Sequence, residues 1–177
     1  MDVEEHDHLQ ASTVSFKFIC FKTPWNNVEG VPRKFFFHFK FFTFPSVKTA
    51  NVTFQNVNEH AKSASDVSGL KPGQPYYLTR LTGANKKEDT LTDPNLLSVT
   101  FTIDPSQSHI KDEHTRLAGY LYDRFLTVDI FDAESLFLYG TCKIPLFELL
   151  RQGRASVVRA KECEMCDPDS GDFRGAI

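Results

Sequence analysis

The feature that most constrains this chain is a run of phenylalanines. Residues 34–44 read KFFFHFKFFTF and hold seven of the chain's 17 phenylalanines. A helix with this sequence would be apolar on nearly every side, whereas phenylalanine favours strands. In a strand, one face carries Phe35, Phe37, Phe39 and Phe41. The opposite face carries Phe36, His38, Lys40, Phe42 and Phe44. We therefore predict a central strand with one buried face and one partly covered face, ended by Pro45.

Short apolar–polar alternations recur along the rest of the chain and predict further strands. These stretches are residues 13–21, 50–55, 76–81, 96–103, 125–131, 136–144 and 155–161, with a last strand beginning at 173–177. Residues 112–124 have apolar spacing that suits one or two helical turns or a bend, and residues 145–150 suit one turn opened by Pro145. The polar connections between so many short strands predict an all-β fold, an antiparallel β-sandwich with one or two short helical turns.

Charge separates the ends of the chain from its middle. Residues 1–8 and residues 162–177 each carry a net charge of −4, which leaves +5 for the residues between them. We predict an acidic tail over residues 1–12 and one domain over 13–177, which stops just as its final strand begins. A charge of +5 is too small to indicate nucleic-acid binding. The acidic start does not resemble a secretory signal, and no apolar run reaches the ~18 residues of a membrane span.

No set of residues suits catalysis or a cofactor. The chain lacks a Gly-x-Ser-x-Gly elbow and a glycine-rich phosphate loop. Cys163 and Cys166 have the spacing of a metal knuckle but no second pair of ligands, while Cys20 and Cys142 lie within apolar runs. We therefore predict a non-enzyme with free thiols and no cofactor.

Residues 126–146 are similar to the late hairpin of C2 domains, in which a strand leads into an acidic loop and then a second strand. Calcium needs six to eight oxygen ligands from several carboxylates. This loop offers Asp132 and Glu134, and the loop expected to oppose it, residues 45–49, contains no acid. We predict a C2-like domain that does not bind calcium.

Two blocks carry a closer resemblance, residues 37–49 and residues 115–136 continuing to 149–154. In these blocks the chain resembles the nephrocystin-4 family of ciliary scaffolds, over roughly residues 34–158. The resemblance implies a non-enzymatic adaptor at the transition zone, basal body, centrosome and cytoskeleton. It also implies two protein partners, nephrocystin-1 and a retinitis-pigmentosa GTPase-regulator-interacting protein.

The candidate binding residues are cations and aromatics. Arg151, Arg154, Arg159 and Lys161 form the most basic stretch, and either remain solvated or contact an acidic partner or lipid head groups. Phe137 and Tyr139 either anchor a partner or are covered by neighbouring loops. Two functions remain open: a protein-interaction domain, or a calcium-independent module that binds anionic membranes through a basic face.

Overall fold

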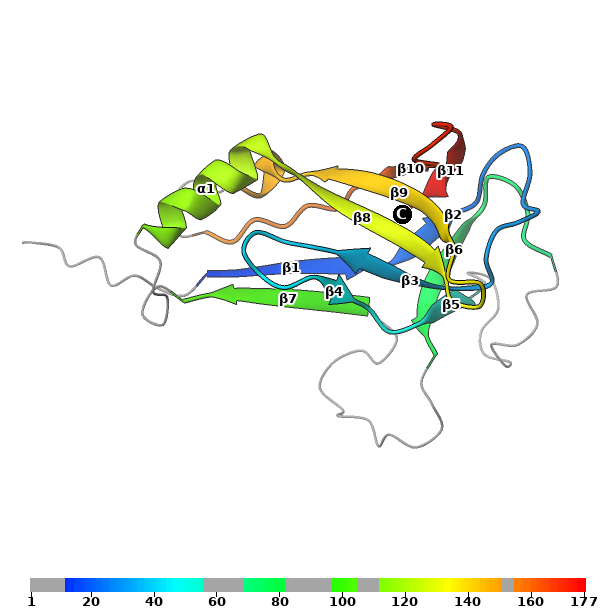
Figure 1. Ribbon diagram of the computed structural model, residues 1–177, viewed down its shortest axis with the longest axis horizontal. Helices are drawn as coiled ribbons and strands as arrows, with labels where there is room; N and C mark the ends of the chain where they lie inside the picture. The colour runs from blue at the N-terminus through cyan, green and yellow to red at the C-terminus, as the bar shows by residue number, and fades with distance from the viewer. Residues whose placement is uncertain (1–11, 56–68, 82–96, 105–111, 151–154) are drawn as a thin grey trace, which may run out of the picture.

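The structure is a computed structural model that describes residues 12–55, 69–81, 97–104, 112–150 and 155–177 (Figure 1). Its strands are β1 (Ser12–Phe18), β2 (Cys20–Lys22), β3 (Lys34–Phe39), β4 (Val47–Lys48), β5 (Val52–Gln55), β6 (Pro75–Arg80), β7 (Leu97–Ile103), β8 (Phe125–Asp132), β9 (Leu138–Pro145), β10 (Glu164–Cys166) and β11 (Phe173–Ala176). The helices are α1 (Glu113–Asp123) and the 3-10 helix η1 (Phe147–Leu149). All strand pairs are antiparallel, so the predicted all-β antiparallel class is confirmed.

Eight strands form a closed, barrel-like circuit. Around it the order is β3, β5, β6, β2, β11, β10, β9 and β8, and β8 pairs again with β3. The short β4 extends one side of β3, while β1 and β7 form a separate two-stranded ribbon. The predicted division into two facing sheets is therefore not confirmed, because hydrogen bonds run from strand to strand around the circuit.

β1 and β2 follow each other directly but join different sheets. Ile19 separates them, is 46% exposed, and accepts a hydrogen bond from the Leu78 N–H of β6 at 2.9 Å. Phe18 before it and Phe21 after it are both buried, so the inward face shifts by one residue at this point. The prediction of one continuous strand with Cys20 on its inner face is wrong here, because the chain passes from the ribbon into the barrel.

The core is largely aromatic and is organised around β3. As predicted, Phe35, Phe37, Phe39 and Phe41 are buried, with 0–2% exposure, while His38 on the other face is half-buried and Lys40 is exposed. Rings from β1 and β7 pack on this row from across the core. The ring centroids of Phe18 and Phe37 lie 4.3 Å apart in a stacked pair. Those of Phe16 and Phe41 lie 5.3 Å apart, edge to face, an arrangement that aromatic pairs favour.

β3 ends earlier than the alternation predicts. The strand stops at Phe39, and the Phe44 N–H donates to the Phe41 carbonyl at 3.0 Å, which turns the chain. Phe42 adopts a left-handed conformation with φ 48°. The prediction of a strand to residue 44 is wrong because the chain must bend there to place β4 beside β3, and it buries Phe41 while doing so.

The prediction of one or two helical turns, or a bend, over residues 112–124 is too short for α1. This helix has eleven residues, and Leu117 and Leu121 form its buried face, one turn apart. η1 follows Pro145 as a single turn, as predicted. α1 is the longest helix in the described part of the chain, and it is too short and too polar to cross a bilayer.

The C-terminal region differs from the prediction at one stretch and matches it at another. Residues 155–161 have no strand partner, and Val158 is 82% exposed, so the predicted strand is wrong. The strand predicted to begin at 173 is β11, which pairs with β10 on one side and with β2 on the other through Ala176 and Lys22. The predicted acidic tail lies almost entirely outside the described residues, which begin at residue 12.

We expect Phe39→Ala to lower the free energy of unfolding by about 3–5 kcal/mol, the usual cost of truncating a buried phenylalanine. Phe39 is 2% exposed and contacts the rings of Phe16, Phe18 and Phe101. The exposed neighbour Lys40 supplies the control, Lys40→Ala, which should change stability by no more than about 0.5 kcal/mol. Urea denaturation followed by fluorescence measures both. Equal effects of the two changes would contradict the assigned faces of β3.

Two glycines should respond oppositely to alanine. Gly175 in β11 has φ +128°, and a Cβ there would lie 2.5 Å from the Lys22 carbonyl oxygen, so Gly175→Ala should separate β11 from β2 and destabilise the barrel. Gly119 in α1 has open space around it, so Gly119→Ala should stabilise the helix by roughly 0.5–1 kcal/mol. Thermal melts of both variants test this, and a neutral Gly175→Ala would show that β11 does not close the barrel as described.

Candidate protein-interaction surface

The β8–β9 turn, residues 132–138, is held by its own hydrogen bonds. The Asp132 N–H donates to the Phe137 carbonyl, and the Leu136 N–H donates to the Asp132 carbonyl, each at 3.0 Å. The Asp132 carboxylate accepts the Glu134 N–H at 3.0 Å and the Ser135 hydroxyl at 2.6 Å. The Ser135 oxygen also accepts the Phe137 N–H, at 3.3 Å. The turn is therefore a fixed frame rather than a loose connection.

This frame presents three consecutive apolar side chains to solvent. Leu136 is 62% exposed, Phe137 77% and Leu138 39%. Leu136 also has a left-handed backbone, with φ 63°, which is strained for a leucine. Strain of this kind is retained where surrounding structure enforces it, and such positions cluster at functional sites.

The turn is anchored to the start of β3. The Ala133 N–H donates to the Lys34 carbonyl at 2.9 Å, and the Lys34 ammonium pairs with the Glu134 carboxylate at 2.9 Å. Hydrogen bonds, the largest from Ser135, hold the pKa of the Asp132 carboxyl below its usual value. Asp132 and Glu134 are the two carboxylates that this turn could offer to calcium. Both already have partners within the protein.

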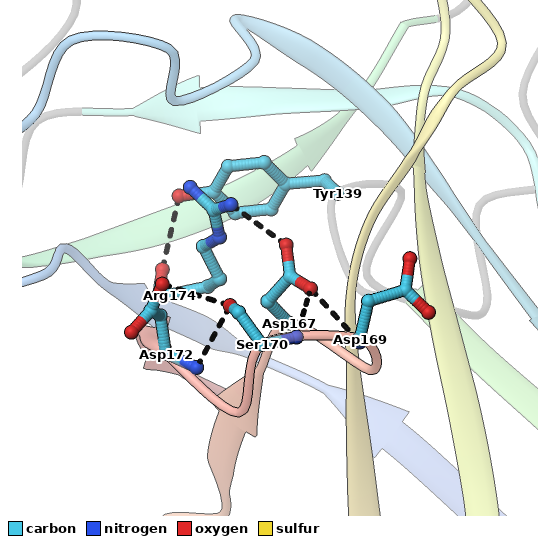
Figure 2. Close-up of polar contacts among 6 residues, drawn as sticks. All are labelled: Tyr139, Asp167, Asp169, Ser170, Asp172 and Arg174. Carbon is cyan, nitrogen blue, oxygen red and sulfur yellow. Dashed lines mark hydrogen bonds and ion pairs between the residues drawn. The ribbon is translucent and has the colours of Figure 1, made fainter.

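Tyr139, the second predicted aromatic anchor, has a different role. It is half-buried, and its hydroxyl donates to the Arg174 carbonyl of β11 at 3.0 Å (Figure 2). Burial raises its pKa to about 12. The Arg174 guanidinium lies over the ring, 5.8 Å from its centroid. Tyr139 therefore ties β9 to the C-terminal hairpin, and its side chain is only partly exposed.

The acidic turn between β10 and β11 is likewise internally bonded (Figure 2). Asp167 accepts the Arg174 guanidinium at 2.7 Å and the backbone N–H groups of Asp169 and Ser170 at 2.9 and 3.1 Å. The Ser170 hydroxyl donates to Asp172 at 2.8 Å. The Arg174 hydrogen bond is the largest cause lowering the pKa of Asp167 from 3.8 to about 2.

The predicted basic stretch is not assembled into one face by the described residues. Arg151 and Arg154 lie outside them. Arg159 is exposed, and its guanidinium donates to the neighbouring Val158 carbonyl at 3.1 Å. Lys161 forms an ion pair with Glu148 of η1. Arg159 and Lys161 are therefore both exposed cations of this stretch, and Lys161 is held by its pairing with Glu148.

The described residues contain no group of three or more histidine, cysteine or acidic side chains suited to a metal ion. All four cysteines are free thiols. Cys142 is buried, as predicted for a core residue, and burial raises its pKa to about 12, whereas Cys20 is only partly buried. Cys163 is buried beside Met165, and burial also raises its pKa. Burial therefore favours the protonated form of the Cys142 and Cys163 thiols.

Sequence reasoning missed several exposed apolar residues. Leu136 and Leu138 flank Phe137, and the run of three apolar residues after a polar turn was the available signal. Trp25 is 63% exposed. The Lys22 ammonium lies over its ring, 4.7 Å from the ring centroid. A second group lies at the opposite end of β8, near α1 and η1, and comprises Tyr122, Phe125 and Phe147. Nothing in their sequence context distinguishes these three from core residues.

The Asp167–Arg174 pair generates a pH prediction. A carboxyl with a lowered pKa stabilises the fold above its unfolded pKa, and that stabilisation is lost as the pH falls through the folded value. We expect Asp167 to titrate near pH 2 in the folded chain, and Arg174→Met to move this pKa back toward 3.8. NMR titration of the carboxyl carbon measures the shift, with Arg116→Met on the exposed face of α1 as the control. An unchanged Asp167 titration in Arg174→Met would contradict the pairing.

Comparison with known proteins gives the chain's relatives. A family model described as "Nephrocystin-4 C2 third domain" matches residues 1–170. Nephrocystin-4 of Homo sapiens is 26% identical over 167 residues, and that of Xenopus laevis is 27% identical over 164 residues. Each alignment covers 92% of this chain and 11% of the relative, so the chain spans about a tenth of these proteins. No solved structure matches the chain. Because the family model covers nearly the whole sequence, the chain belongs to the nephrocystin-4 C2 third domain family.

Proposed function

We propose that this chain is a non-catalytic protein-interaction domain of a nephrocystin-4-like scaffold at the ciliary transition zone and basal body. The observation that carries the proposal is the β8–β9 turn, which exposes Leu136, Phe137 and Leu138 together. Exposed aromatic residues with apolar neighbours are the usual anchors of protein interfaces. The surface is small, so it suits one anchor point within a larger scaffold contact.

The stiffness of the turn supports the same function. Binding costs less when the contacting residues are already ordered, because fewer torsions must be fixed. Five hydrogen bonds within the turn and one to Lys34 hold its backbone before any partner arrives. The strained Leu136 is held by the same bonds, which is consistent with a shape maintained for recognition.

We also propose that the domain acts without calcium. Asp132 is occupied by backbone and hydroxyl donors, and Glu134 by Lys34. Residues 40–49, which follow β3 and include β4, contain no acid. Calcium would have to displace existing partners and would find too few carboxylates to balance its charge.

The partners and the location are proposed from the resemblance to the nephrocystin-4 family. They are nephrocystin-1 and the retinitis-pigmentosa GTPase-regulator-interacting protein, at the transition zone, basal body, centrosome and associated cytoskeleton. The chain corresponds to about a tenth of the full-length relatives. The domain would therefore contribute one contact among several.

Phe137→Ser should weaken partner binding about 30-fold, because truncating an interface anchor costs about 2 kcal/mol. The matched control is Phe147→Ser, which removes a 55% exposed aromatic near the opposite end of β8. Biolayer interferometry with each of the two proposed partners, with calcium and with chelator, measures the affinity. The expected result is a loss for Phe137→Ser only, and no effect of the chelator.

Three results would contradict this proposal. Equal losses from both substitutions would remove the β8–β9 turn as the contact, and binding abolished by chelator would remove the calcium-independent mechanism. Absence of binding to either partner, together with salt-sensitive flotation on anionic phosphatidylserine vesicles, would support the membrane-binding alternative instead. A loss of flotation in Arg159→Glu would then implicate Arg159 in lipid binding.

A further inference from the structure

Among the described strands, β7 is paired along one edge only. It pairs with β1 along its whole length, in unbroken register from Leu97–Phe18 to Ile103–Ser12, and no other described strand pairs with it. The N–H and C=O groups on the second edge of a strand can bond to another extended chain. β7 is therefore an edge strand of seven residues.

Natural edge strands are usually protected against such pairing. The protective features are short length, a charged side chain, a proline or a bulge. β4, which extends one side of β3, has two of these, since it is two residues long and contains Lys48. β7 has none of them: its sequence LSVTFTI contains no charge and no proline, and its register with β1 shows no bulge. An unprotected edge of this length indicates that pairing is tolerated or used.

The side chains of β7 are arranged symmetrically about Thr100. Apolar residues at 97, 99, 101 and 103 alternate with hydroxyl residues at 98, 100 and 102. Leu97, Phe101 and Ile103 are buried, Thr100 and Thr102 are exposed, and Val99 is only partly covered. The sequence therefore has the same pattern when read in either direction, so antiparallel pairing of two copies about Thr100 brings like residues together.

We propose that β7 pairs with β7 of a second copy of this chain, antiparallel and centred on Thr100. This register places Thr100 opposite Thr100, Ser98 opposite Thr102, and Val99 opposite Phe101. Hydroxyl residues then meet hydroxyl residues and apolar residues meet apolar residues, so no charge is buried. The two ribbons join into a four-stranded sheet with the order β1, β7, β7, β1 and a two-fold axis.

The existing β1–β7 ribbon shows a contact of the same type. The hydroxyls of Ser15 and Thr100 lie 2.8 Å apart across the ribbon, so the exposed face already carries a hydroxyl pair between neighbouring strands. Dimerisation would extend this row across the new strand boundary. It would also cover Val99, the core-facing residue of β7 that remains partly exposed.

A charge-swap experiment on the 177-residue chain tests the register. Sedimentation velocity at rising concentration should show a reversible dimer of the wild-type chain. Thr100→Lys and Thr100→Glu should each weaken dimerisation at least tenfold, because each places like charges opposite one another. An equimolar mixture of the two variants should restore association as a heterodimer. Thr13→Lys, an exposed position on β1, is the control and should dimerise like the wild type.

The folded state of each variant is checked by its thermal melt, since Thr100 is exposed and its substitution should preserve the fold. A wild-type chain that stays monomeric up to about 1 mM, the weak end of the affinity scale, would overturn the proposal. So would a mixture of Thr100→Lys and Thr100→Glu that associates no better than either variant alone. Unchanged dimerisation in both single variants would place the dimer contact elsewhere and equally reject the register.

Discussion

The structure depends on enclosing the aromatic row of β3. Three phenylalanine rings project from one face of β3 and Phe41 continues the row just past its end, and each must lose contact with water for the fold to be stable. One neighbouring strand cannot cover a row of this size. Strands from both halves of the chain therefore curl around it, and the ribbon of β1 and β7 supplies the rings of Phe16, Phe18 and Phe101 from the other side. The closed circuit of strands is the consequence.

Closure of the barrel leaves its turns as exposed surfaces at the strand ends. The eight residues of β8 extend about 25 Å at ~3.3 Å per residue, so its two ends present separate surfaces. At one end the β8–β9 turn exposes apolar side chains on a bonded frame. The β10–β11 turn also bonds internally, yet it exposes acidic groups and is tied to the barrel by Tyr139. Two turns that are each held by internal hydrogen bonds thus present chemically different surfaces.

Alternation predicted much of the fold, because it reports which face of each strand is buried. It located β3, β5, β6, β7, β8 and β9 and the inward rows of Phe35 and Leu126. It failed where tertiary contacts reverse a local pattern: at Ile19, where the strand changes sheets, and at 155–161, where alternation exists without a partner strand. For the candidate site, alternation placed Phe137 and Tyr139 on one face, but only the pairing of β9 with its neighbours shows that the first is exposed and the second is covered. Strand pairing over long sequence distance is not encoded in local periodicity.

The pairing of β2 with β11 has a consequence for how the domain forms. Ala176 meets Lys22, so the barrel closes between segments about 150 residues apart. Contacts between such distant segments slow folding, because a large loop must be ordered before they can form. During synthesis, the N-terminal strands would wait for β11 to leave the ribosome, with the phenylalanine row still open to solvent. This architecture therefore leaves apolar surface exposed on the nascent chain until β11 is in place, the kind of surface that chaperones shield.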